Sequence, residues 1–296
     1  MRSDPALWVA NQFYTKFVGK VIPAKYFGFD IPQQNKLTMP NGKPHLEIVC
    51  HCWQYAHMLV YQISSLVNFS PKELTVTYSL FYADEDEQTQ QLVDAFSAMS
   101  VPNVTWNWNK IPKESLFRRA IGRNQAALNS TANWLWFTDC DLVFHEGCLD
   151  TLSASLNTQQ TGLLYPARES ITDLLPADHP MIDQSLAQAP PLDIDTSLFH
   201  NNEISKAKGA FQIVHGDVAR AAGYCNNMKL YQQPDSRWRK TYEDTVFRNL
   251  IGYQGKPVDV PQLYRIRHVA KGRYAKDSAI SDIRGKIRHA QDSNEQ

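Results

Sequence analysis

The sequence of 296 residues lacks three features that each mark a class of proteins. It has no excess charge, because 30 Lys and Arg balance 30 Asp and Glu, so no global positive field draws it to nucleic acid or anionic membranes. It has no apolar run near the roughly 18 to 20 residues that span a bilayer. It has no CxxC pair among its five cysteines. These absences favour small-molecule or glycan partners and argue against a nucleic-acid partner.

The cysteines and the first residues of the chain also indicate the cellular compartment of the protein. The cysteines are odd in number and lie mostly in apolar surroundings, which favours reduced thiols in a cytosolic protein. The chain begins Met1–Pro5 and then carries Trp8, Lys16 and Lys20 among short apolar runs, so it has no uninterrupted apolar region of the signal-peptide kind. We therefore expect a cytoplasmic protein without a transmembrane segment, and the sequence leaves peripheral membrane contact open.

The hydrophobic content, 43% of the residues, is enough to bury a substantial core. Apolar and β-branched runs alternate with segments whose apolar residues recur at helical spacing. Strands are expected at 46–50, 74–82, 104–108 and 134–138, and helices at 55–67, 89–99 and 113–130. This alternation predicts an α/β fold, a doubly wound and mostly parallel sheet flanked by helices in a single main domain.

Composition divides the chain into regions. Residues 1–44 are an N-terminal extension that ends in a run containing Pro and Gly, and 45–270 are the main domain. Within that domain, 165–205 contain five prolines and are expected to be a loop-rich insertion, a kind of segment that is often functional. Residues 271–296 are a basic C-terminal tail, which either contacts phosphate or is a solvated end.

Acidic residues point to a metal site at one place in the chain. Three Asp-x-Asp triplets occur, at positions 84–86, 139–141 and 193–195. The last lies in the proline-rich insertion, where a turn or solvated loop explains it. Asp139 and Asp141 directly follow the apolar run Trp134–Phe137, and burying like charges without a cation is costly. Carboxylate oxygens suit Mg²⁺ or Mn²⁺ completed by substrate phosphates, so this triplet predicts a metal-diphosphate site.

Two ordered blocks of the sequence resemble the family 2 glycosyltransferases of the GT-A fold. The first block runs from Arg123–Ala126 through Trp134–Asp141. In that family, an Arg-Asn pair opens the helix of this block and the acidic triplet closes the next strand. The second resembles the acceptor-side segment of that family; it consists of Gly209–Phe211, Gly223–Tyr224 and Tyr242–Thr245, followed by Arg248 and Gly252. The resemblance covers roughly residues 45–270 and implies a GT-A type fold.

The resemblance implies roles on the donor side of such a site. Asp141 would contact the metal directly, and Asp139 would support the metal or the ribose. Arg123 and Asn124 would face the diphosphate or the acidic triplet, although Arg123 could instead be an exposed helix residue. His268 matches the place where many GT-A enzymes bring a late histidine to the metal, and imidazole complements two carboxylates there.

The resemblance also implies roles for residues on the acceptor side. Asp244 is the candidate catalytic base, and Glu243 would hydrogen-bond the acceptor; capping of the following helix by these acids is the structural alternative. Trp238 either stacks on an acceptor sugar or packs in the core. At the end of the second strand, Asp84 is a candidate for nucleotide binding, or else a charged residue facing water.

Together these features predict a metal-dependent glycosyltransferase that moves a sugar from a nucleoside diphosphate sugar, with a UDP-sugar favoured, to a glycan or other hydroxyl acceptor. The cofactor would be Mn²⁺ or Mg²⁺, and attack opposite the diphosphate would invert the anomeric centre. One alternative is a nucleotidyltransferase on a related sheet. That class usually has a Gly-rich basic loop after the first strand, whereas Cys50–Tyr55 has neither Gly nor Lys. The other is a non-catalytic glycan-binding protein that retains the fold.

Overall fold

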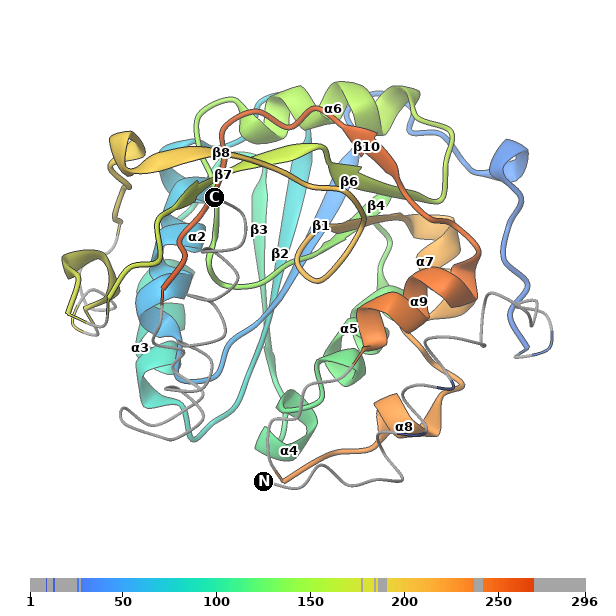
Figure 1. The fold of residues 1–296 in the computed structure, drawn as a ribbon, viewed down its shortest axis with the longest axis horizontal. Helices are drawn as coiled ribbons and strands as arrows, with labels where there is room; N and C mark the ends of the chain where they lie inside the picture. The colour runs from blue at the N-terminus through green and yellow to red at the C-terminus, as the bar shows by residue number, and fades with distance from the viewer. Residues whose placement is uncertain are drawn as a thin grey trace.

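The computed structural model describes residues 9, 13, 26, 28–176, 178–183, 185, 191–236 and 242–268. A seven-stranded sheet runs through the centre of the molecule in the order β10-β6-β9-β4-β1-β2-β3 (Figure 1). Its strands are β1 (His45–His51), β2 (Thr75–Tyr82), β3 (Val104–Lys110), β4 (Trp134–Phe137), β6 (Leu163–Pro166), β9 (Gln212–His215) and β10 (Lys256–Val258). Only β9 runs antiparallel to its neighbours in this sheet. The predicted mostly parallel α/β sheet flanked by helices is therefore confirmed.

A second, four-stranded sheet has the order β5-β11-β7-β8. Its strands are β5 (Leu142–Phe144), β7 (Arg168–Thr172), β8 (Phe199–Glu203) and β11 (Leu263–Arg265). The proline-rich segment 165–205 supplies β7 and β8, with two short 3-10 helices between them, Pro180–Ile182 and Thr196–Leu198. β7 pairs with both β8 and β11, so part of this segment forms regular structure that the prolines did not suggest.

Helices cover the central sheet. Figure 1 shows α2 and α3 on one side of β1–β3, and α5, α7 and α9 on the other. The helices are α2 (Ala56–Asn68), α3 (Glu87–Ser97), α4 (Lys113–Leu116), α5 (Arg119–Asn129), α6 (Cys148–Thr158), α7 (Gly216–Ala222), α8 (Lys229–Gln232) and α9 (Glu243–Ile251), with a 3-10 turn at Gln34–Lys36. Among the residues described, no helix has both the length and the apolar character needed to cross a membrane.

The single helix expected over 113–130 is divided into α4 and α5. Arg118 leaves the helical conformation, with φ −111° and ψ 83°, and its guanidinium lies 2.9 Å from the Asp235 carboxylate. The Arg118 side chain is buried and that of Asp235 is only 10% exposed, which makes this ion pair costly to break. The break at Arg118 sets the first residue of α5 at Arg119, and this determines where the polar face of α5 points.

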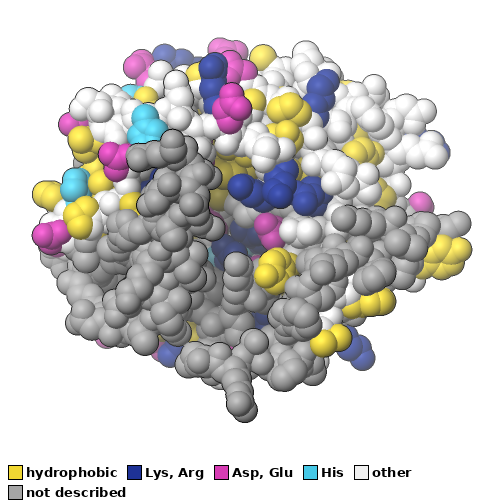
Figure 2. Space-filling model, viewed as in Figure 1, with side chains coloured by type: hydrophobic (Ala, Val, Ile, Leu, Met, Phe, Trp, Pro, Cys, Tyr) yellow, Lys and Arg dark blue, Asp and Glu magenta, His cyan; other side chains and the backbone are white. Residues whose placement is uncertain are grey.

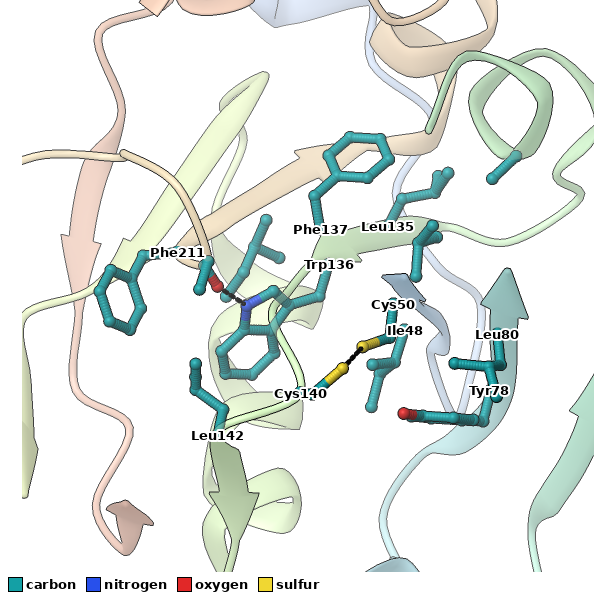
Figure 3. Close-up of a cluster of buried hydrophobic side chains, with 14 of the residues drawn as sticks. Ile48, Cys50, Tyr78, Leu80, Leu135, Trp136, Phe137, Cys140, Leu142 and Phe211 are labelled. Atoms are coloured by element: carbon teal, nitrogen blue, oxygen red, sulfur yellow. Dashed lines mark hydrogen bonds between the residues drawn. The ribbon is translucent and has the colours of Figure 1, made fainter. Parts of the chain in front are cut away.

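The core surrounds β4. All four of its residues are fully buried, because helices and sheets cover both faces, and this explains its uninterrupted apolar run. The indole Nε1 of Trp136 donates to the Ala210 carbonyl at 2.8 Å, as Figure 3 shows, and that of Trp134 donates to the Leu156 carbonyl at 3.0 Å. β4 is thus rigidly held, and the acidic triplet leaves its carboxyl end.

The five cysteines are all free and buried, as expected for reduced thiols. Cys50 and Cys140 face each other with their sulfur atoms 3.6 Å apart (Figure 3). Hydrogen bonds from neighbouring thiols and burial raise the pKa of Cys140 well above its usual value, and burial raises that of Cys225. These thiols therefore stay protonated and unreactive in the folded protein.

Ellman's reagent tests this burial. In the native protein at neutral pH we expect no thiol to react within minutes, because the thiolate is the reactive form and none of the thiols is exposed. In denaturant all five should react. Rapid reaction of one or more thiols in the native protein would contradict the packing described here.

A close approach fixes α5 against the sheet. A Cβ atom at Gly122 would lie 2.3 Å from Nε2 of His51 and 2.9 Å from Cγ of Phe81, at the carboxyl ends of β1 and β2. Glycine in a helix interior normally costs about 1 kcal/mol relative to alanine. Here the absence of a side chain lets α5 reach the strand ends.

The substitution Gly122→Ala should therefore destabilise the protein by about 1–3 kcal/mol, against the usual helix preference, since the methyl group overpacks the contact. Urea unfolding measures the change. Gln125→Ala, on the exposed side of the same helix, is the control and should shift stability by less than about 0.5 kcal/mol. A stabilised Gly122→Ala protein would show that α5 does not approach the strands so closely.

Candidate active site

The acidic triplet turns away from the end of β4 in a fixed conformation. The Gln62 side chain, from α2, donates to the carbonyl oxygens of Asp139 at 2.9 Å and Leu142 at 3.0 Å, and Tyr78 donates to Gln62 at 2.6 Å. The Asp139 side chain is 36% exposed, whereas Asp141 is only 6% exposed. The triplet therefore presents one carboxylate toward the outside and one toward the interior.

Two arginines of α5 meet the outer carboxylate. Arg119 and Arg123 are four residues apart and so lie on one face of the helix. Arg119 Nη1 donates to Asp139 Oδ1 at 2.7 Å, and Arg123 Nη2 lies 3.8 Å from the same oxygen. Arg123 is fully buried against the rings of Phe137 and Tyr224, and its Nη1 donates to the Tyr224 hydroxyl at 2.9 Å. Arg123 therefore lies beside the triplet, and its role toward a diphosphate remains a prediction.

Arg119 also reaches the acidic pair of the second sequence block. Its Nε lies 3.7 Å from Oε1 of Glu243, which is buried in the first turn of α9. Burial tends to lower the pKa of Arg119, but the carboxylates of Asp139 and Glu243 outweigh it and raise the pKa above its usual value. Arg119 is therefore a permanent positive charge between two acidic motifs that are distant in sequence.

Asp244 follows Glu243 in the same turn and faces a different partner. Its Oδ2 accepts a hydrogen bond from the Gly209 backbone N–H at 2.9 Å, and its carbonyl oxygen accepts from the Gln212 amide at 2.9 Å. The N-cap of α9 is Tyr242, which makes no capping bond through its side chain. Glu243 and Asp244 lie in the first turn and suit the helix dipole, while Arg119 and Gly209, which contact their side chains, lie outside α9.

Asn124 connects α5 to the turn after α7. Its Oδ1 accepts from the Tyr224 backbone N–H at 2.8 Å, and its Nδ2 donates to Asn226 at 2.9 Å. Gly223, at φ +58°, leaves room for it, because a Cβ there would lie 2.3 Å from Asn124 Oδ1. Asn124 thus holds in place the Tyr224 hydroxyl that binds Arg123; its contact with a diphosphate remains a prediction.

His268 lies near the triplet and is fully buried. The Ile266 backbone N–H donates to the Asp141 carbonyl at 2.9 Å, which places the end of β11 beside the triplet. The Nε2 of His268 is hydrogen-bonded to the Tyr55 hydroxyl, and the two rings stack at 5.4 Å. Within the described part of the chain, no group of three or more His, Cys, Asp or Glu side chains is placed to hold a metal ion. Metal binding therefore remains a prediction.

A partly buried ion pair flanks the triplet from the small sheet. Arg265 on β11 forms a two-pronged contact with Glu169 on β7, with N–O distances of 2.8 and 2.6 Å. Burial tends to lower the pKa of Arg265, whereas the bond to Glu169 and the charges of Asp141 and Asp139 raise it. A third cation thus lies close to the triplet. In Figure 2, basic and acidic side chains lie together around a hollow in this face.

A neutral histidine lies beneath this cluster at the end of β1. His51 is buried and stacks on Phe81, with ring centroids 4.9 Å apart. Burial first, and then the charges of Arg123 and Arg119, lower its pKa well below the usual value. The histidine therefore stays uncharged and adds no positive charge to the site.

The other acidic triplets and the last predicted contact lie elsewhere. Asp86 is buried and caps α3, accepting from Thr89, while Asp84 is exposed and pairs with Lys110 at 2.9 Å. Asp195 caps an exposed turn through Ser197, as predicted for a solvated loop. A nucleotide-binding role for Asp84 remains a prediction, and Trp238 lies outside the described residues, as does the basic tail 271–296.

Sequence reasoning missed Arg119 and Arg265. The signal for Arg119 was its spacing of four residues from Arg123, which puts both side chains on one helical face. The helix expected over 113–130 contains both residues, so this signal was already present in the sequence. For Arg265 no signal existed, because its partner Glu169 lies in a segment that was expected to be loop-rich.

Comparison with known proteins gives structural likenesses alone. No family model matches the chain, and no curated protein matches its sequence. Among solved structures, the fold is similar to residues 1–349 of S. aureus TarS, with TM-score 0.44 and 13% identity over 76% of this chain and 57% of that one. It is also similar to the same protein in complex with UDP-GlcNAc, with TM-score 0.48 and 12% identity over 79% of this chain and 62% of that one. For the complex with UDP, the TM-score is 0.47 and the identity is 12% over 75% of this chain and 60% of that one. The chain thus spans less than two thirds of those chains, and likenesses this loose leave its function to be argued from its own residues.

Proposed function

We propose that this chain is a glycosyltransferase that moves a sugar from a nucleoside diphosphate to a hydroxyl acceptor. One observation supports this most: Arg119 joins Asp139, at the end of β4, to Glu243, in the first turn of α9. Two acidic motifs that the sequence resemblance assigns to donor and acceptor thus belong to one charged cluster. The cluster lies where open α/β sheets bind ligands, at the carboxyl ends of their strands.

The donor diphosphate would lie at the arginines of α5. A guanidinium presents a planar fork of donors that matches phosphate oxygens, and the partly exposed Arg119 brings such a fork to the end of β4, while the buried Arg123 adds a second positive charge behind it. Buried cations here would stabilise the charge that develops on the leaving diphosphate when its bond to the sugar breaks. Rigid placement of Arg123 against two aromatic rings reduces the reorganisation required during the reaction.

The donor set of the triplet fits a divalent cation. Mg²⁺ and Mn²⁺ are bound through one or two carboxylates, with the remaining ligands supplied by substrate phosphates and water, so a cluster of three protein ligands is not required. Asp141 and Asp139 would hold the ion. His268 would join only by giving up its bond to Tyr55 or by using its other ring nitrogen. Bound there, the cation would neutralise charge on the diphosphate.

On the acceptor side, Asp244 would take the proton of the attacking hydroxyl, and Glu243 would hydrogen-bond the acceptor. The bond from Gly209 fixes one oxygen of Asp244 and leaves the carboxylate oriented in the first turn of α9. The acceptor oxygen would form its bond to the anomeric carbon as the bond to the diphosphate breaks on the opposite side. Such a displacement inverts the configuration at that carbon.

The alternative functions make different use of the same residues. A nucleotidyltransferase would also use carboxylates and a divalent cation, but it leaves the link between Asp139 and Glu243 without a role. A non-catalytic glycan-binding protein would need neither the buried arginines nor Asp244. Turnover of a nucleoside diphosphate sugar, including its slow hydrolysis, separates the proposed enzyme from such a binding protein.

Donor binding gives the first test. A panel of nucleoside diphosphate sugars with Mn²⁺ should contain at least one that raises the thermal midpoint, because a ligand that binds the folded state stabilises it. Asp141→Ala should abolish that metal-dependent shift. Asp195→Ala, which removes a carboxylate from an exposed triplet, is the matched control and should keep it. Full metal-dependent stabilisation of Asp141→Ala would place the donor elsewhere.

The assignment of Asp244 has a separate test. Asp244→Asn should lower transfer by roughly a hundredfold to ten-thousandfold, as loss of a general base does. Donor binding should stay unchanged, since an amide oxygen can still accept from Gly209. Asp217→Asn serves as control, because Asp217 also accepts a backbone N–H, from Thr38, at the opposite end of β4. Undiminished transfer by Asp244→Asn, or retained configuration in product NMR, would refute the proposed mechanism.

A further inference from the structure

Arg119 and Arg123 bind the same oxygen of Asp139 but differ in freedom. The Arg123 side chain is fully buried, and its guanidinium is held by Tyr224 and by two aromatic rings. The Arg119 side chain is 22% exposed and stands at the first position of α5. Arg119 can therefore change partners by rotating its side chain, whereas Arg123 cannot without disturbing the core.

The contact of Arg119 with Asp139 opposes a cation at the triplet. The 2.7 Å bond is a charge-assisted hydrogen bond, one of the stronger kinds in proteins. A divalent ion that approached Asp139 would compete with this guanidinium for Oδ1 and would be repelled by its charge. A diphosphate removes both obstacles, because its oxygens offer the guanidinium a better partner and bring negative charge to the ion.

We propose that Arg119 is a positioning residue that makes the cation and the donor diphosphate bind together. Without donor, Arg119 holds the Asp139 carboxylate. With donor, its guanidinium turns to the diphosphate and releases Asp139 to the cation, while Arg123 keeps the carboxylate in place. This inference rests on the proposed function and adds to it an explanation of why the site would bind its two ligands in concert.

The rotation of the Arg119 side chain would also change the surroundings of Glu243 on the acceptor side. Arg119 is the cation nearest to Glu243 Oε1 in the ion pairs of the described chain, at 3.7 Å, and Glu243 Oε2 is buried without a hydrogen-bond partner among the described residues. When Arg119 turns to the diphosphate, Glu243 loses that counter-charge. An acceptor hydroxyl can then donate to the carboxylate, so the acceptor site would be completed only after the donor is bound.

The experiment compares Mn²⁺ and UDP binding by calorimetry in the wild type and in Arg119→Gln. In the wild type, Mn²⁺ alone should bind weakly, and UDP should strengthen it at least about tenfold. In Arg119→Gln, Mn²⁺ alone should bind about tenfold more tightly, because its competitor is gone, and UDP with Mn²⁺ should bind about tenfold more weakly. The mutual strengthening of the two ligands should fall toward none, as reciprocal linkage requires.

Two further variants keep the result interpretable. Arg220 also lies 2.7 Å from an aspartate, Asp217, but at the opposite end of β4. Arg220→Gln is therefore the control, and it should change neither the affinity for Mn²⁺ nor the affinity for UDP. Arg119→Lys keeps the positive charge but loses the planar fork of donors. It should therefore shift the affinities for Mn²⁺ and for UDP in the same directions as Arg119→Gln does, but by smaller factors. If Arg119→Gln does not fold, this variant decides the question.

The outcomes separate the two proposals. If the wild type binds neither UDP nor any other nucleoside diphosphate, the proposed function fails and the inference fails with it. If the wild type binds UDP and Mn²⁺ in concert and Arg119→Gln binds them with unchanged coupling, the inference alone is wrong. Weaker binding of Mn²⁺ alone by Arg119→Gln would also overturn it, because Arg119 would then support the cation.

Discussion

The ion pair between Arg119 and Asp139 is the contact on which the arrangement of the candidate site depends. It exists because two independent constraints meet. β4 is buried on both faces, so its first accessible carboxylate is Asp139, at the tip of the strand. α5 begins at Arg119 because Arg118 turns aside to Asp235, and Gly122 lets the helix approach the strand ends. The guanidinium therefore arrives within 2.7 Å of the carboxylate.

The surroundings satisfy the remaining charges and restrict their movement. Burying an ion without a partner is costly, and the structure supplies one on each side: Tyr224 for Arg123 and Glu169 for Arg265. Below them, the neutral His51 fills the space against Phe81 without adding charge. The result is a rigid set of cations around two carboxylates, with Arg119 as the member best able to change partners.

Sequence patterns predicted the sheet and the position of Asp139 and Asp141, because β4 is short, apolar and followed at once by charge. They could not predict which residue begins α5, since the break depends on the tertiary contact between Arg118 and Asp235. Arg119 was missed because no sequence pattern shows that Asp139 and Glu243 both lie beside it. Likewise, Asp84 and Asp86 look alike in sequence, and only the packing of α3 shows that Asp86 is a buried cap. The bond between His268 and Tyr55 joins two ends of the domain that no local pattern connects.

The central claim is that the end of β4 binds a nucleoside diphosphate together with a divalent cation. A crystal structure of the protein with UDP and Mn²⁺ tests it most directly, because the anomalous scattering of Mn²⁺ locates the ion independently of the protein chain. We predict a peak within bonding distance of the Asp141 carboxylate, with the diphosphate between that ion and the guanidinium of Arg119. An ion or a nucleotide bound away from the acidic triplet would contradict it.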